Sequence, residues 1–377
     1  MRRSQTLVLA VLALVFLGGF ELGRAQAAPA PESWATVAEL SRPRAFARAV
    51  PLVTGEVLVL GGLDPLDPQV TSFTSELFDP RTRDTEVLPD PILGRLNQSV
   101  TVGWGDRVVV AGGTEWRVVG WSAVDRVEVF NPYSRDWYVA DSLRAARSDH
   151  AAAALSDGRI LVVAGNDGPR LLASAEIYDP AADRWTSVAP LPRPRTQATA
   201  ATLPDGRVLV VGGIDRDGAE TNTTFIYDAV SDEWSVGPDM RYDRLTHAMV
   251  TLANGDVLVI GGQGAGSGTA ERYDFRLGRF VHAGALIEPR LVAQAARLPD
   301  GRVLLAGGLS SVIHPHFDPL VHAEVWDPAD QRWHPLAEPP SPRAYGVVVA
   351  TDEGAFRISG SGFDEETYAS IERFGTP

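Results

Sequence analysis

The 377-residue sequence lacks several features that would point to a particular chemistry. It has no cysteine, so no disulfide can form and no lipid can be attached through a cysteine at a processed N-terminus. Its formal net charge is −14, and this shortage of basic side chains argues against nucleic acid and anionic membranes as partners. It also contains no recognisable nucleophile elbow, phosphate-binding glycine loop or pair of catalytic carboxylates.

Residues 1–27 differ from the rest of the chain. Two arginines follow the first methionine, an apolar run covers Thr6–Leu17, and residues 25–27 have the small-x-small pattern of a cleavage site. This pattern predicts a secretory signal peptide, a mature N-terminus at Ala28 and a short flexible lead over residues 28–33. The alternative is an uncleaved N-terminal anchor. Export without cysteines favours a bacterial periplasmic or secreted protein. The intact mass of the exported protein checks this, and a full-length, membrane-retained species would contradict it.

The remainder of the sequence repeats one unit about every 50 residues. Each unit opens with an arginine, at Arg44, Arg95, Arg147, Arg195, Arg244, Arg290 and Arg343. An apolar run then ends in a glycine pair, at Gly61-Gly62, Gly112-Gly113, Gly212-Gly213, Gly261-Gly262 and Gly307-Gly308, with Gly165-Asn166 and Gly360-Ser361 as weakened versions. An aromatic residue followed by Asp or Asn comes next, and a late tryptophan follows at Trp137, Trp185, Trp234 and Trp333. We expect these tryptophans to pack between neighbouring units.

These units resemble the kelch repeat, whose pattern is carried by the glycine pair after an apolar strand, the Tyr-Asp step and the spaced tryptophan. The resemblance covers essentially everything after residue 33. It implies an all-β fold, a seven-bladed β-propeller of four-stranded blades over residues 34–377, with blades that start near the seven arginines. The last unit ends before any tryptophan, whereas Trp34–Leu40 has the sequence of a fourth strand. We therefore predict that residues 34–40 complete the last blade and close the ring.

The seven repeat arginines are the first candidates for a functional site. Each precedes an innermost strand, so the symmetry of a propeller would bring seven guanidiniums to one mouth of the channel. His150 and His247 lie three residues further along, and Asp149 and Asp243 lie beside the same ring. Such a funnel would bind a carboxylate, sulfate or phosphate. The structural alternative is that each arginine bonds carbonyls of the adjacent blade or pairs with loop carboxylates.

Two loops expected on the same face supply further candidates. Trp116 and Trp121 lie outside the blade pattern and would stack on sugar rings or anchor a protein partner. The alternative is that they fold down over the top of their blade. His314, His316 and His322 lie close together, and imidazoles of this kind bind Zn²⁺ or Cu²⁺. Histidines spaced by proline also occur as solvated side chains, and a closed metal site would need further ligands.

Three classes of function remain open. We favour a secreted binding protein that recognises an extracellular carbohydrate, with an acidic one preferred, or a protein partner. The second class is a sugar-processing enzyme of the epimerase or mutarotase type, because the resemblance extends to sugar oxidases and sialic acid epimerases. An epimerase-like reaction would need an arginine clamp with an acid and a base, such as His150 with Asp149 or Asp243. Copper radical oxidases of this kind need a tyrosine cross-linked to cysteine, which this chain lacks. The third class is a structural scaffold of the cell envelope. We expect a monomer without a cofactor.

Overall fold

The structure, a computed structural model, describes residues 32–64, 67–71, 74–89, 94–117, 120–310, 318–362 and 366–375. The predicted leader lies outside these residues. The described residues form β-strands and one 3-10 turn at Trp104–Asp106. Among them, no helix has the length and apolar character needed to cross a membrane.

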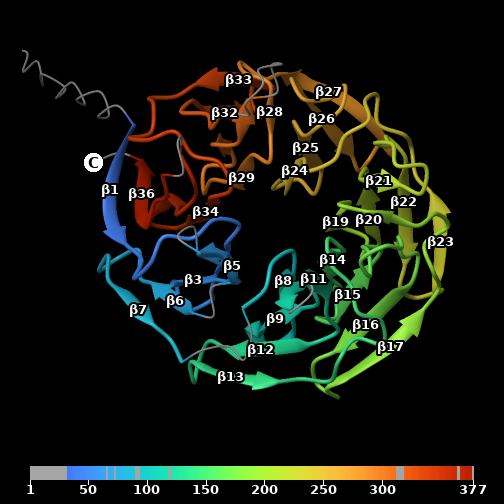
Figure 1. Ribbon diagram of the computed structural model, residues 1–377. Coiled ribbons are helices and arrows are strands. Elements are labelled where there is room, and N and C mark those ends of the chain that lie inside the picture. Colours follow the sequence, from blue (N-terminus) through green and yellow to red (C-terminus); the bar gives the residue numbers. More distant parts are fainter. Residues whose placement is uncertain are drawn as a thin grey trace, which may run out of the picture. The chain divides into compact units, whose positions relative to one another are not determined.

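Seven four-stranded antiparallel sheets surround a central channel as the blades of a β-propeller, which confirms the predicted fold (Figure 1). From the innermost strand outwards, blade 1 contains β2 (Arg48–Pro51), β3 (Val57–Leu60), β6 (Ser75–Phe78) and β7 (Thr85–Val87), and blade 2 contains β8 (Ser99–Val102), β9 (Val108–Ala111), β12 (Val127–Asn131) and β13 (Asp136–Val139). Blade 3 contains β14 (Ala151–Ala154), β15 (Ile160–Val163), β16 (Ala175–Asp179) and β17 (Arg184–Val188), and blade 4 contains β19 (Thr199–Thr202), β20 (Val208–Val211), β22 (Thr224–Asp228) and β23 (Glu233–Val236). Blade 5 contains β24 (Ala248–Thr251), β25 (Val257–Ile260), β26 (Thr269–Asp274) and β27 (Arg279–Ala285), and blade 6 contains β29 (Gln294–Arg297), β30 (Val303–Ala306), β32 (Ala323–Asp327) and β33 (Arg332–Pro335). Blade 7 contains β34 (Val347–Thr351), β35 (Gly354–Ile358), β36 (Ser370–Gly375) and β1 (Ser33–Glu39).

The hydrophobic core lies between neighbouring blades. Small side chains are common in the innermost strands, as in the four alanines of β14, because the blades crowd together at the channel. The second strands are apolar on both faces, and every residue of β20 is fully buried. The late tryptophans pack as predicted: Trp185 is fully buried, and its indole N–H donates to the carbonyl of Asp141 in the preceding blade at 2.8 Å.

The N-terminal strand closes the ring. β1 pairs antiparallel with β36, and Trp34 lies opposite Phe374 with the ring centroids 5.2 Å apart. Blade 7 therefore takes its outermost strand from the start of the chain and its other three from the end, as predicted. This pairing covers the strand edge that β36 would otherwise expose.

The glycine pairs connect each blade to the next. Gly113 donates its N–H to the carbonyl of Arg147 in the following blade at 2.8 Å. Gly112 and Gly113 both have positive φ, 62° and 101°. A Cβ on Gly112 would lie 2.5 Å from the Arg147 oxygen, and one on Gly113 would lie 2.6 Å from the oxygen of Leu96. The pair is therefore required by close backbone approach as well as by conformation.

The two weakened repeats are one residue away from the predicted register. Ala164 and Ser359 occupy the first glycine position, with φ of 66° and 58°, and Gly165 and Gly360 occupy the second. The contacts fix this alignment, because Ala164 and Ser359 offer their carbonyls to the repeat arginine of their blade, as Gly112 does in blade 2. The predicted pairs Gly165-Asn166 and Gly360-Ser361 are therefore wrong by one position.

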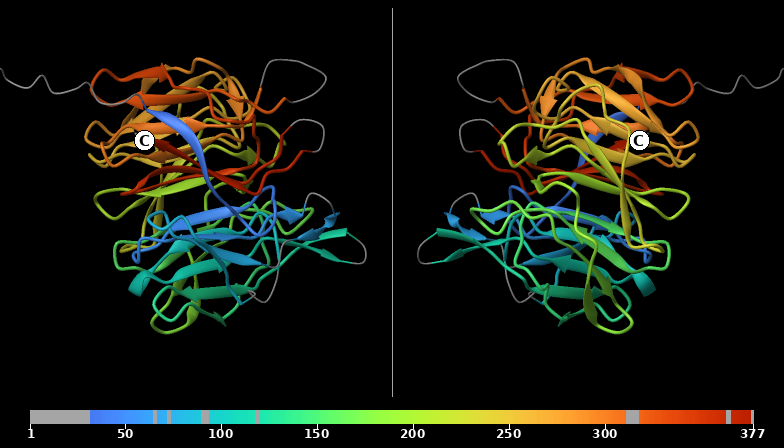
Figure 2. Two further views of the ribbon diagram at one scale, coloured as in Figure 1. Left: turned by 90° about the vertical axis from the view of Figure 1, so that its left-hand side faces the viewer. Right: turned by 90° about the vertical axis from the view of Figure 1, so that its right-hand side faces the viewer.

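Short two-stranded ribbons extend from the second strands on one side of the ring, which we call the loop face. They are β4 (Leu63–Asp64) with β5 (Asp67–Thr71), β10 (Thr114–Arg117) with β11 (Gly120–Ala123), β18 (Arg195–Thr196) with β21 (Ile214–Asp215), and β28 (Arg290–Leu291) with β31 (Leu309–Ser310). The β10–β11 hairpin, drawn in teal, projects beyond the blades in the side views of Figure 2.

Candidate functional site

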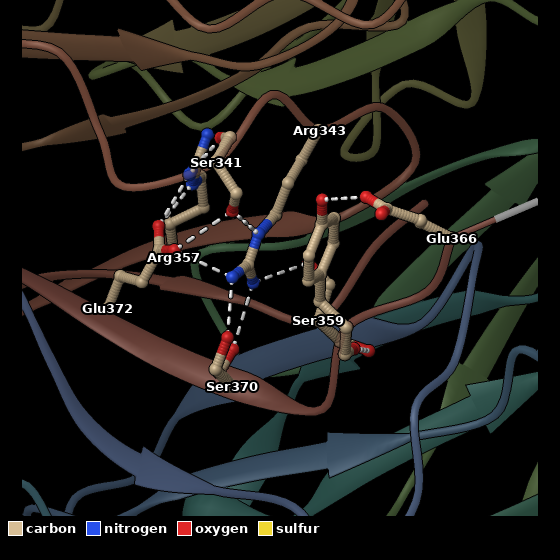
Figure 3. Close-up of polar contacts among 8 residues, drawn as sticks. Ser341, Arg343, Arg357, Ser359, Glu366, Ser370 and Glu372 are labelled. Carbon is tan, nitrogen blue, oxygen red and sulfur yellow. Dashed lines mark hydrogen bonds and ion pairs between the residues drawn. The ribbon is translucent and has the colours of Figure 1, made fainter. Parts of the chain in front are cut away.

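Each repeat arginine lies inside its own blade and bonds the ends of the second and third strands. Arg147 shows the arrangement: its Nη1 donates to the carbonyls of Ala164 and Ser174, both at 2.9 Å. Its Nη2 lies 2.7 Å from Oε1 of Glu176 on β16. Figure 3 shows the corresponding contacts of Arg343 in blade 7. One guanidinium therefore bonds to the end of the second strand, to the residue before the third strand and to a glutamate within the third strand.

A buried glutamate pairs with the repeat arginine in six blades. The pairs are Arg44–Glu76, Arg95–Glu128, Arg147–Glu176, Arg244–Glu271, Arg290–Glu324 and Arg343–Glu372. In blade 3 the other oxygen of Glu176 accepts the backbone N–H of Arg144 at 2.7 Å, so the carboxylate also anchors the loop that leads into the blade. These glutamates were not among the candidates predicted from the sequence, although five of the six stand two residues before the aromatic-acid step and Glu372 stands two residues before Phe374. We call the seven arginines and six glutamates the arginine–glutamate girdle.

The girdle arginines are inaccessible from the channel. None of the seven has more than 2 % of its surface exposed. Burial lowers the pKa of Arg147, and the bond to Glu176 acts in the opposite direction. The donors of the predicted funnel are therefore engaged in structural contacts, but these lie within the arginine's own blade and involve a strand glutamate, and not the adjacent blade or a loop carboxylate as the structural alternative supposed. A ligand-binding role for these arginines stays a prediction.

Blade 4 departs from the girdle pattern. Phe225 stands where the other blades have glutamate, and its ring lies 4.7 Å from the guanidinium carbon of Arg195. Arg195 keeps its bonds to the carbonyls of Gly212 and Thr223, both at 3.0 Å. Burial lowers the pKa of Arg195 to about 10, and the charge of Asp215 acts in the opposite direction. An aromatic face has replaced the carboxylate as the neighbour of this cation.

A cavity of about 700 Å³ lies at the loop-face mouth of the channel. Its rim contains the residue two positions after each repeat arginine, namely Phe46, Asn97, Asp149, Gln197, Thr246, Val292 and Tyr345. All seven have a left-handed backbone, with φ between 49° and 60°, although none is glycine. Such residues each cost on the order of 1–3 kcal/mol and gather at functional sites. We call these seven residues the mouth ring.

The backbone of the mouth ring is incompletely paired. Neighbouring members bond directly at three blade boundaries, from Phe46 N–H to Tyr345 at 2.9 Å, from Asp149 N–H to Asn97 at 3.1 Å and from Gln197 N–H to Asp149 at 2.9 Å. At the other four boundaries no described residue pairs with the N–H groups of Asn97, Thr246, Val292 and Tyr345, or with the C=O groups of Phe46, Gln197, Thr246 and Val292. Because backbone N–H and C=O groups need hydrogen-bond partners, these groups are available to water or a ligand in the cavity.

The side chains of the mouth ring divide into an aromatic and a polar sector. Phe46 of blade 1 and Tyr345 of blade 7 stack with their ring centroids 4.1 Å apart. Asn97, Asp149 and Gln197, from blades 2 to 4, present amide and carboxylate groups to the same cavity. The mouth can therefore offer an apolar face and several planar hydrogen-bonding groups to one ligand.

Among the described residues that line the cavity, Arg48 is the one arginine and Asp149 the one carboxylate. Arg48 begins β2 and is exposed to the channel. Protein surrounding the channel lowers the pKa of Arg48, and the charge of Asp149 acts in the opposite direction. Asp149 accepts hydrogen bonds from Ser148 Oγ at 3.1 Å and Asn166 Nδ2 at 3.2 Å. Burial raises the pKa of Asp149, and these two bonds only partly offset it.

The predicted histidines reach the cavity wall as buried bridges between blades. His150 and His247 have 9 % and 5 % of their surface exposed. His150 Nε2 lies 2.9 Å from Ser99 Oγ, and His247 Nε2 lies 2.7 Å from Thr199 Oγ1, each across a blade boundary. Burial lowers the pKa of both imidazoles to about 3, with nearby arginines acting in the same direction. Both side chains are therefore neutral at ordinary pH.

The two predicted loop tryptophans stand on the β10–β11 hairpin. Trp116 and Trp121 are cross-strand partners in edge-to-face contact, with their ring centroids 5.4 Å apart. They are 42 % and 40 % exposed, so they do not fold down into the blade. The hairpin begins at Thr114, whose N–H donates to Leu96 at 2.7 Å, directly beside the mouth residue Asn97. Their role in binding stays a prediction.

The predicted metal site is only partly described. His314 and His316 lie outside the described residues. His322 places Nδ1 2.8 Å from Glu288 Oε2 and Nε2 3.2 Å from Glu338 Oε1. The part of the chain that the structure describes contains no group of three or more His, Cys, Asp or Glu side chains able to hold a metal. Metal binding in this loop stays a prediction.

Three comparisons place the chain among known proteins. The Kelch motif matches residues 147–192 and 194–241, which correspond to blades 3 and 4. The Kelch-like protein terF of Aspergillus terreus (strain NIH 2624 / FGSC A1156) is 27 % identical over 124 residues, a match that covers 31 % of this chain and 27 % of terF. The chain therefore spans about a quarter of that relative's length. A fungal alcohol oxidase of the AA5 family, solved in complex with copper, superposes with a TM-score of 0.73 at 18 % identity, covering 92 % of this chain and 76 % of the oxidase.

Together with the seven repeated blades, these matches identify the protein as a kelch-repeat β-propeller. Propellers of this kind support a binding or scaffolding role. The likeness to the oxidase is a likeness of fold, which does not carry an activity with it.

The described residues of this channel provide no group of side chains that could hold a copper ion. The Nε2 atoms of His150 and His247 already contact the hydroxyls of Ser99 and Thr199. No third donor joins them into a metal-binding cluster within the described ranges. The chain also has no cysteine for the cross-link that copper radical oxidases require. A copper centre therefore does not fit the described residues.

Sequence analysis missed Arg48 and most of the mouth ring. The signal for Arg48 is its departure from the repeat, because it stands four positions after the first repeat arginine. The same position in the other six units holds Ser99, Ala151, Thr199, Ala248, Gln294 and Val347. The mouth ring is likewise a position where the units differ, and such positions are invisible to a search for what the units share.

Proposed function

We propose that the protein is an exported binding module that holds a carbohydrate at the mouth ring. The observation that carries this proposal is a cavity of about 700 Å³ whose rim combines the stacked pair Phe46–Tyr345 with Asn97, Asp149 and Gln197. This volume is within the range of about 300–1,000 Å³ that is usual for small-ligand sites. Sugar rings combine an apolar C–H face with hydroxyl edges, so both sectors of the rim have a counterpart on one ligand.

The unpaired backbone of the mouth ring supports a ligand rich in hydroxyl groups. At four blade boundaries an unpaired C=O of one blade and an unpaired N–H of the next belong to the ring. A hydroxyl can donate and accept at once, so it satisfies such a pair with a single group. A carbohydrate presents several hydroxyls on one rigid ring, which suits a binding site that repeats this arrangement around a circle.

The tryptophan hairpin extends the same surface. Trp116 and Trp121 project from the loop face, and the hairpin starts beside Asn97 of the mouth ring. Exposed indoles provide large apolar platforms for sugar rings. We assign this hairpin to the outer units of a longer saccharide whose terminal unit occupies the cavity.

Titration calorimetry of the purified protein against neutral and acidic mono- and oligosaccharides tests the proposal. Tyr345→Ala removes half of the aromatic sector, and we expect it to weaken binding about tenfold or more. Trp116→Ala/Trp121→Ala should weaken long saccharides and leave short ones unchanged. Trp104→Ala is the matched control, because Trp104 is 52 % exposed and lies between the first and second strands of blade 2, away from the loop face. Failure of every saccharide to bind would contradict the proposal.

A further inference from the structure

Arg48 differs from the seven girdle arginines, which lie nearby in the same repeats. The seven girdle arginines have their guanidiniums buried and bonded to backbone carbonyls. Arg48 instead lines the cavity and is exposed to it. No described residue forms a hydrogen bond or an ion pair with its guanidinium. Among the described residues that line this cavity, Arg48 is thus the one guanidinium whose donors are all available.

The surroundings of Arg48 leave its charge uncompensated at short range. Asp149, the one carboxylate among the described lining residues, belongs to blade 3 and accepts bonds from Ser148 and Asn166. The charge of Asp149 acts on Arg48 from a distance, without an ion pair between them. On a protein with a formal net charge of −14, a single accessible cation inside a polar cavity favours anionic ligands over neutral ones at that place.

The position of Arg48 relative to the mouth ring suits a ligand that carries its charge on one end. Arg48 stands two residues after Phe46 on the innermost strand, so it lies deeper in the channel than the aromatic sector. Ser99, Thr199 and Gln294 occupy the equivalent position in other blades and offer neutral hydroxyl and amide groups. A guanidinium binds a carboxylate through two parallel N–H···O bonds, a geometry that an ammonium cannot match.

We propose that Arg48 makes the cavity selective for sugars that carry a carboxylate. The carboxylate of a uronic acid pairs with the Arg48 guanidinium, while the hydroxyls of the same ring bond the mouth ring. This assignment rests on the proposed carbohydrate function and adds that the preferred sugar is negatively charged. It also moves the anion-binding role from the buried girdle to an arginine that a ligand can reach.

Calorimetry with glucuronate and glucose tests this selectivity, since the two sugars differ by one carboxylate. The wild-type protein should bind glucuronate about 10- to 100-fold more tightly than glucose. Arg48→Gln should remove this preference, so that glucuronate and glucose bind with similar affinity. Arg48→Lys keeps the charge without the fork and should give an intermediate preference. Arg216→Gln is the matched control, because Arg216 is an exposed arginine of a loop on the same face.

The outcomes separate this inference from the function on which it rests. Equal binding of glucose and glucuronate by the wild type would overturn the role of Arg48 and leave the carbohydrate function standing. A parallel loss of both sugars in Arg48→Gln, with unchanged thermal unfolding, would also overturn the charge selectivity. Binding of acetate as tight as that of glucuronate would show a general anion site in place of a sugar site. If neither sugar binds, the proposed function fails and the inference fails with it.

Discussion

The girdle and the mouth ring lie two residues apart in every blade, yet they vary in opposite ways. The girdle position is arginine in all seven blades, and its guanidinium bonds equivalent carbonyls each time. The mouth position holds seven different residues, and each is held in the same left-handed backbone. Positions that repeat therefore maintain the blades, whereas positions that differ give one mouth of the channel its chemistry.

The difference also concerns how polar groups are satisfied. In the girdle a cation, a carboxylate and several carbonyls meet inside the protein and pair with one another. At the mouth ring, four backbone N–H groups and the guanidinium of Arg48 have no partner among the described residues. Buried charge without a partner is strongly destabilising, whereas unpaired groups that face a solvent-filled cavity are available for a ligand.

The largest effect expected from this comparison is the loss of one girdle carboxylate. Glu176→Ala would leave the Arg147 guanidinium buried without its counter-charge and free the backbone N–H of Arg144. Breaking a buried ion pair by removing one partner costs about 3–5 kcal/mol. We therefore expect Glu176→Ala to lower the free energy of unfolding by about that amount, measured by denaturant titration.

Glu233→Ala is the matched control for this prediction. Glu233 is an exposed residue of β23, and its truncation should change the free energy of unfolding by no more than about 0.5 kcal/mol. Mouth-ring variants such as Tyr345→Ala should also leave most of the stability in place. A cost for Glu176→Ala similar to that of Glu233→Ala would contradict the structural role of the girdle.

The fold could be predicted almost completely because it depends on what the units share. The glycine pairs, the aromatic-acid steps and the late tryptophans recur at fixed spacing, and each reflects a backbone or packing requirement of a blade. Ring closure by β1 followed from one missing strand at one end of the chain and one extra strand at the other. The register of the weakened glycine pairs could be determined only from the structure, because Ala164 and Ser359 adopt the left-handed backbone conformation although neither is glycine.

The candidate site could be predicted only in part, for a physical reason. Recurrence drew attention to the repeat arginines, but the equally recurrent glutamate of the third strand was overlooked, and its pairing with six of the arginines needed the structure. His150 and His247 were placed near the channel correctly, whereas their burial depends on packing between blades. Arg48 and the mouth ring can be recognised as parts of one site only when the structure shows which side chains line the cavity.

Each of the two cavity histidines gives a smaller effect, which depends on pH. Their pKa values are lowered to about 3 in the folded protein, against about 6.5 in the unfolded chain. Between these values the unfolded chain binds more protons, so the stability that the neutral imidazoles allow is complete above pH 6.5 and is lost as the pH falls. At pH 5 the loss is about 2 kcal/mol for each histidine. We expect His150→Gln/His247→Gln to reduce the loss of stability between pH 7.5 and pH 5, as measured by denaturant titration at both values. The exposed His282 supplies the control, because His282→Gln replaces a histidine outside the cavity and keeps both buried imidazoles. A double variant that loses as much stability on acidification as the wild type would show that these imidazoles are not buried as the structure places them.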